Sequence, residues 1–138
     1  MPLIHMRVHT EGPPSAIVIQ LGENDLPATD CLTLRSIIQK DLQDLASYWP
    51  TVKMFWSQLL QRHVWRGSHS PAATEKARKR TNSATIKVIQ GLGGFVITHP
   101  DINVKASHMY RDDGVHLSSL GSDTWLNSVA SGLKAWVE

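Results

Sequence analysis

The sequence predicts an α/β fold in which helices cover a parallel β-sheet. Short apolar runs alternate with longer segments of helical periodicity, in the order strand, helix, strand, helix, strand, helix. This alternation is typical of parallel strands joined by right-handed helical crossovers. A length of 138 residues and a hydrophobic content of 41% suit one domain over residues 1–138.

The first strand is predicted over residues 16–21, a nearly continuous apolar run rich in β-branched residues that follows two prolines. A run of this kind is typical of a buried parallel strand. From Asp30 to about Trp49, apolar residues recur at spacings of three and four, which predicts a helix. Its expected inner face consists of Leu34, Ile37, Ile38, Leu42 and Leu45.

A second strand and helix follow. Residues 52–56 are apolar enough for a strand, residues 61–70 form a polar loop, and residues 72–90 have helical periodicity. The expected apolar face of this helix is thin and consists of Ala73, Ala77, Ala84 and Val88. Glycines directly after it supply the backbone freedom that a helix end favours.

The third strand is predicted over residues 95–98, and a last helix follows the loop around Asp113. Ser118 or Ser122 is a candidate N-cap for that helix. Its expected apolar face consists of Leu126, Val129, Leu133 and Trp136.

Polar residues follow all three predicted strands. Asn24 lies after the first strand, residues 57–66 lie after the second, and Asp113 lies in the loop after the third. Ligands of open α/β sheets bind at the carboxyl ends of the strands. We therefore expect these three segments to converge on one rim of the sheet.

Composition and charge narrow the range of partners. The net charge of +2 is too small to indicate a dedicated nucleic-acid partner. We interpret the basic run of Lys76, Arg78, Lys79 and Arg80 as a solvated helix face, with phosphate binding as the less favoured alternative. No stretch reaches the ~20 apolar residues that span a bilayer, so we expect no membrane partner.

Cysteine and histidine usage indicates neither a disulfide nor a metal. Cys31 is the single cysteine, which excludes an intramolecular disulfide and suits a cytoplasmic protein. The seven histidines show no metal-ligand spacing. We expect neither a metal nor a cofactor.

Two short motifs carry a family resemblance. Gly22-Glu23-Asn24-Asp25 after a strand, and Asp113-Gly114-Val115-His116-Leu117 before the last helix, resemble two conserved blocks of the SGNH hydrolases, the GDSL-type esterases and lipases. The resemblance covers the chain from about Ser15 onward. Residues 65–67, 99–102 and 110–114 are also similar to SGNH-like domains of vertebrate retroelement-derived proteins. The family fold is a flavodoxin-like three-layer α/β/α sandwich.

The resemblance implies a role for three residues. His116 would be the general base, Asp113 would orient its imidazole, and Asn24 would donate its amide to the oxyanion. The chemistry suits these residue types, because acyl transfer needs a base beside the nucleophile and donors where negative charge develops. An oxyanion donor of this kind typically contributes ~3 kcal/mol.

The sequence departs from the family in its nucleophile. The Gly-Asp-Ser block that ends the family's first strand is missing, and no Gly-x-Ser-x-Gly elbow replaces it. We interpret the chain as a parallel sheet lacking its first two strands, with residues 1–10 as a helix remnant and residues 16–21 as an exposed edge open to self-association. Ser57 at the rim is a weak candidate for a substitute nucleophile.

Two functions remain open. The first is the C-terminal part of a serine esterase that acts on a small ester or acyl substrate once completed, and that is inactive alone. The second is a noncatalytic remnant that serves as an interaction module.

Overall fold

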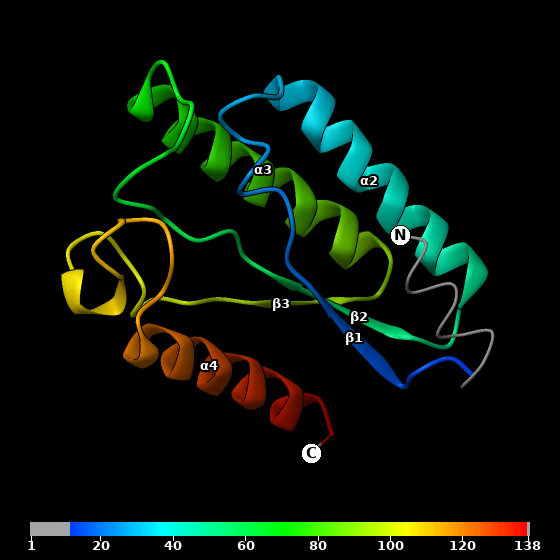
Figure 1. The fold of residues 1–138 in the computed structure, drawn as a ribbon. Helices are drawn as coiled ribbons and strands as arrows, with labels where there is room; N and C mark the ends of the chain where they lie inside the picture. The colour runs from blue at the N-terminus through cyan, green and yellow to red at the C-terminus, as the bar shows by residue number, and fades with distance from the viewer. Residues whose placement is uncertain (1–11, 138) are drawn as a thin grey trace.

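The computed structural model describes residues 12–137, which form a mixed α/β fold (Figure 1). The predicted order of strands and helices is confirmed, with ends that differ by a few residues. The helix remnant predicted for residues 1–10 lies outside the described residues. In chain order the elements are β1 (Ala16–Ile19), α2 (Cys31–Tyr48), β2 (Lys53–Ser57), α3 (Pro71–Gly91), β3 (Phe95–Ile97), the 3-10 turn η1 (Ser107–Met109) and α4 (Ser119–Val137).

The strands form one parallel sheet in the order β1-β2-β3. Ile17 lies opposite Met54, and Trp56 lies opposite Val96. Because side chains alternate between the faces of a strand, these four residues share one face and the residues between them point to the other. β1 and β3 are the outer strands, so one edge of each has no strand beside it among the described residues.

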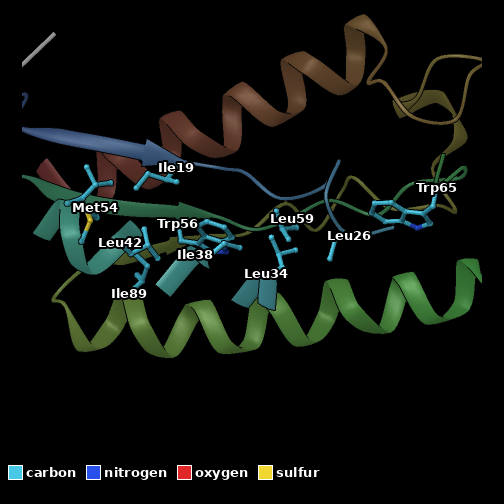
Figure 2. Close-up of a cluster of buried hydrophobic side chains, with 11 residues drawn as sticks. Ile19, Leu26, Leu34, Ile38, Leu42, Met54, Trp56, Leu59, Trp65 and Ile89 are labelled. Atoms are coloured by element: carbon cyan, nitrogen blue, oxygen red, sulfur yellow. The ribbon is translucent and has the colours of Figure 1, made fainter. Parts of the chain in front are cut away.

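The main core lies between the sheet and the helix pair α2 and α3. Figure 2 shows side chains of β1, β2, α2 and α3 meeting there, together with residues from the loops after the strands. Trp56 lies in the middle of this cluster with 0% of its surface exposed. Asp30 caps α2 by accepting from the backbone N–H of Thr33 at 3.1 Å.

The opposite face of the sheet is covered by α4 (Figure 1). The ring of Phe55 stacks on Phe95 and meets Trp136 edge-on, with centroids 5.1 and 5.6 Å apart. Gly132 lets the helix approach β3, since a Cβ there would lie 3.0 Å from Ile97 Cγ1. The predicted inner face of this helix is wrong at Leu126, whose side chain is 55% exposed.

The predicted inner face of α3 is wrong at Ala73, which is exposed. Ala77 and Val88 are partly buried and pack against the main core, as predicted. The fully buried residues of this helix are Thr74, Thr81, Asn82, Thr85 and Ile89. Their polar atoms are satisfied inside the fold: Thr85 Oγ1 donates to the carbonyl of Thr81 at 2.8 Å. Asn82 bonds the indole N–H of Trp56 and both backbone groups of Leu59. These partners allow polar side chains to occupy a core position that alanines alone would fill poorly.

Candidate functional site

The loops that follow the three strands meet at the carboxyl ends of the strands. The loop after β2 contacts both of the others. Arg62 Nη2 donates to Asn24 Oδ1 of the first loop at 3.1 Å. The backbone N–H groups of His63 and Val64 donate to the carbonyl of Gly114 at 2.9 and 3.0 Å. The three polar segments expected at one rim are therefore connected there.

Asp113 and His116 form a hydrogen-bonded pair. His116 Nδ1 lies 2.5 Å from Asp113 Oδ2, and Asp113 Oδ1 accepts from the backbone N–H groups of Val115 and His116 at 2.8 and 2.9 Å. The bond to the His116 ring, followed by these two backbone bonds, holds the pKa of Asp113 well below its usual range. An ionised carboxylate only accepts, so in the neutral form of the His116 ring the proton is on Nδ1 and the lone pair is on Nε2.

The pair sits at the tip of a short hairpin-like loop. Tyr110 and Leu117 form an antiparallel bridge, and the N–H of Arg111 donates to the carbonyl of His116 at 2.8 Å. The tip turns at Gly114, which has φ +68° and lies against His63 and the neighbouring Val64. The Tyr110 hydroxyl donates to the carbonyl of Gln61 at 2.8 Å, and burial raises its pKa to about 12. The side chain of His116 itself is 58% exposed.

Asn24 lies in the turn after β1. The carbonyl of Gly22 accepts from the N–H groups of Asp25 and Leu26, both at 3.1 Å, which fixes the turn. Arg62 occupies the Oδ1 atom of Asn24, so the amide N–H groups point away from Arg62. Asn24 and the Asp113–His116 pair are linked through the loop after β2, and the described residues show no direct hydrogen bond between them.

Two arginines of the loop after β2 contact these groups. The guanidinium of Arg62 lies over the ring of Trp65, 5.2 Å from its centroid. Arg66 Nη2 lies 3.6 Å from Asp113 Oδ2. Both arginines belong to the segment 57–66 that was expected at the rim, where Trp65-Arg66 is a candidate substrate contact, but neither arginine was predicted to contact Asn24 or Asp113.

Ser57, which was predicted to lie at the rim, belongs to a second polar cluster whose other members were not predicted. Gln20 Oε1 lies 2.5 Å from Ser57 Oγ and accepts from the indole N–H of Trp125 at 2.7 Å. Ser57 Oγ lies 2.7 Å from His99 Nε2, and the rings of His99 and Trp125 stack. Gln20 follows β1, Ser57 ends β2 and His99 follows β3, so the positional rule that selected Asn24 also applies to them.

The hydrogen-bond partners in this cluster determine which atom donates in each bond. Gln20 Nε2 donates to Glu23 Oε1 at 2.5 Å, so Gln20 Oε1 is the acceptor toward Ser57. The hydroxyl proton of Ser57 therefore goes to Gln20, and His99 donates its Nε2 proton to Ser57 Oγ. Burial lowers the pKa of His99 to about 4, which keeps the ring neutral, and its Nδ1 has no hydrogen-bond partner among residues 12–137.

Ser57 is consequently a poor nucleophile. Its side chain is 0% exposed, and the neighbouring histidine presents a proton to its oxygen and no lone pair. A general base has to accept the hydroxyl proton of the serine it activates. The cluster instead connects the ends of the three strands with α4.

Comparison with protein-family models gives no match, and comparison with curated proteins gives none either. Within residues 12–137, no group of three histidine, cysteine or acidic side chains is placed to hold a metal ion. No helix in the same part of the chain combines the length and apolar character needed to cross a bilayer.

Proposed function

We propose that this chain carries part of an SGNH-type serine ester hydrolase site. In this proposal His116 is the general base, Asp113 orients its ring, and Asn24 is an oxyanion donor. The observation that carries it is the 2.5 Å contact between His116 Nδ1 and Asp113 Oδ2. This contact leaves the basic Nε2 of an exposed ring available to a nucleophile.

The placement of Asn24 supports its proposed role. Arg62 holds the carbonyl oxygen of the side chain, which leaves the amide N–H groups as donors toward a substrate. The same arginine stacks on Trp65, so the orientation of the amide is supported by a packed group. The loop after β2 also holds the carbonyl of Gly114 and so positions both halves of the site.

In this proposal another segment supplies the nucleophilic serine. Ser57 is buried and donates its proton to Gln20, so it does not supply the reacting oxygen. The proposed complete fold is a flavodoxin-like three-layer sandwich in which two further strands extend the sheet beyond β1, one of them paired with it. Among the described residues, one edge of β1 has no strand beside it. A serine at the end of an added strand would reach the same rim as His116.

Hydrolysis of p-nitrophenyl acetate by the purified chain tests the proposed base and oxyanion donor. The chain alone should not turn over as a serine esterase, but water can replace the missing serine. We therefore expect slow, water-dependent hydrolysis that His116→Ala lowers at least tenfold, since general bases contribute ~10²–10⁴-fold. Asn24→Ala should lower the rate as well. His69→Ala is the matched control, because His69 is also exposed. Equal rates for the native chain and His116→Ala would contradict the proposed function.

Fluorophosphonate labelling followed by mass spectrometry tests the missing nucleophile separately. We expect no labelled serine in this chain, because no serine hydroxyl is hydrogen-bonded to His116 among the described residues. A label that disappears in His116→Ala would show that the chain contains its own nucleophile. The esterase proposal would then hold in a complete form.

A noncatalytic interaction module is the second candidate function. Ser57 is buried and hydrogen-bonded to His99, so these polar residues at the strand ends stabilise the fold. This favours the alternative function. Under this alternative the Asp113–His116 pair only stabilises its loop, and His116→Ala would leave ester hydrolysis unchanged.

A further inference from the structure

A groove of about 620 Å³ runs along β3 and α4. None of its nine lining residues belongs to β1 or β2, so it lies beside the outer strand of the sheet. Three of them, Val96, Ile97 and Thr98, come from β3 and the residue after it. The volume is in the range of sites that enclose small ligands or a few peptide side chains.

The backbone of β3 offers unused hydrogen-bonding groups toward this groove. The N–H of Gln58 donates to the carbonyl of Ile97 at 3.0 Å, so the backbone groups of Ile97 point to β2. Because the direction alternates along a strand, the N–H and C=O groups of Val96 and Thr98 point outward. No proline, bulge or charged residue within residues 95–98 blocks pairing at this edge.

The wall formed by α4 is polar. Thr124 and Ser128 direct their hydroxyls to carbonyls of their own helix, at 2.8 and 3.2 Å. Asn127 and Ser131 are exposed, and among the described residues their side chains have no hydrogen-bond partner. Asp101 is the charged member of the lining and is also exposed. The groove therefore combines a strand edge, a polar wall and one negative charge.

We propose that this groove binds an extended peptide that carries a basic side chain. The peptide adds to β3 as a fourth strand through the outward backbone groups of Val96 and Thr98. Its basic side chain pairs with Asp101, and its neighbouring side chains lie against Asn127 and Ser131. This binding activity is independent of the proposed ester hydrolysis, since it uses none of Asn24, Asp113 and His116.

Selection from a phage-displayed library of random ten-residue peptides on the immobilised 138-residue chain tests the proposal. We expect enriched peptides that share a lysine or arginine. Asp101→Lys should weaken their binding about tenfold and shift a new selection toward acidic residues. N-methylation at alternate positions of a selected peptide should abolish binding in one register and leave the other intact, because only one set of N–H groups faces β3.

A pair of neighbouring substitutions on α4 provides the structural control. Ser131→Tyr fills the groove and should abolish peptide binding, whereas Ala130→Tyr adds the same side chain to an exposed position outside the lining. Both positions are exposed, so both variants should fold. Failure to enrich any peptide, or binding that Ser131→Tyr leaves unchanged, would overturn the proposal. Binding that Ser131→Tyr leaves unchanged would indicate that the peptide pairs with the edge of β1 and not with β3.

Discussion

The buried imidazole of His99 should make the fold sensitive to acid. Burial lowers its pKa from 6.5 to about 4, so the folded chain favours the neutral ring. The unfolded chain binds a proton on this residue below about pH 6.5. The free energy of unfolding therefore falls as the pH drops from 6.5 toward 4, by about 3 kcal/mol at most.

Urea denaturation at pH 7 and pH 4 measures this loss. His99→Gln keeps an N–H for Ser57 but has no titrating group, so it should lose about 3 kcal/mol less than the native chain between the two pH values. His69→Gln is the control, because His69 is exposed, and it should behave as the native chain does. If the native chain and His99→Gln lost the same free energy of unfolding between pH 7 and pH 4, His99 would not be the cause of the acid sensitivity.

Gly114 should tolerate no side chain. Its φ of +68° disfavours other residues, and an added Cβ would lie 2.9 Å from both His63 Cβ and Val64 Cγ2. We expect Gly114→Ala to lower the free energy of unfolding by about 2–4 kcal/mol. Gly67, with φ +77° and open space around it, isolates the backbone contribution. Gly67→Ala should cost only about 1 kcal/mol in the same urea titration.

At the scale of elements, the position of α4 depends on a second close approach. A Cβ at Gly121 would lie 2.0 Å from the carbonyl oxygen of Met109 in η1. Gly121→Ala should therefore displace the start of the helix and cost about 2–3 kcal/mol. Gly91→Ala, in α3 and with nothing near its Cβ, should stabilise the chain by up to about 1 kcal/mol.

Thermal unfolding followed by circular dichroism compares these two variants. The expected order of melting temperature is Gly91→Ala above the native chain and Gly121→Ala below it. Melting of Gly121→Ala at the native temperature would show that the helix start shifts without cost.

The elements themselves could be predicted from the sequence, whereas their inner faces could not always be. Apolar runs mark β1, β2 and β3, and the spacing of Leu34 and Ile38 marks α2. In α3 the prediction of Ala77 and Val88 as inward residues is confirmed, but Ala73 is exposed, and the burial of Thr81 and Asn82 was not predicted. A hydropathy pattern predicts that a polar side chain such as that of Asn82 is exposed. Asn82 is buried because tertiary partners such as Trp56 supply its hydrogen bonds.

At the scale of the whole molecule, the open edge of β1 should promote self-association. Its four residues, AIVI, carry no charge, and β2 is the one strand that pairs with β1 among the described residues. We expect light scattering after size exclusion to show species larger than a monomer. Val18→Lys places a charge beside the edge and should reduce them. Val104→Lys, in an exposed loop, is the control, and a monomeric native chain would contradict the prediction.

The sequence predicted that the three loops share one rim, but the individual contacts of the candidate site could be predicted only where they are local in sequence. Asp113 and His116 lie three residues apart, so one tight loop brings them together, as the spacing predicts. The link from Asn24 to that loop passes through Arg62, 38 residues away in the chain, and depends on how the loop after β2 folds. The roles of Gln20 and His99 depend on the same three-dimensional convergence, which no short motif records.

The bond between Gln20 and Trp125 joins residues 105 positions apart. During synthesis on the ribosome, β1 emerges long before α4, so Gln20 spends that interval without the indole N–H of Trp125. The rings of Phe55 and Phe95 likewise remain uncovered by Trp136 until α4 has been synthesised. Apolar surface that stays exposed during synthesis makes a chain prone to aggregation, so the late arrival of α4 is a point of risk in the folding of this sheet.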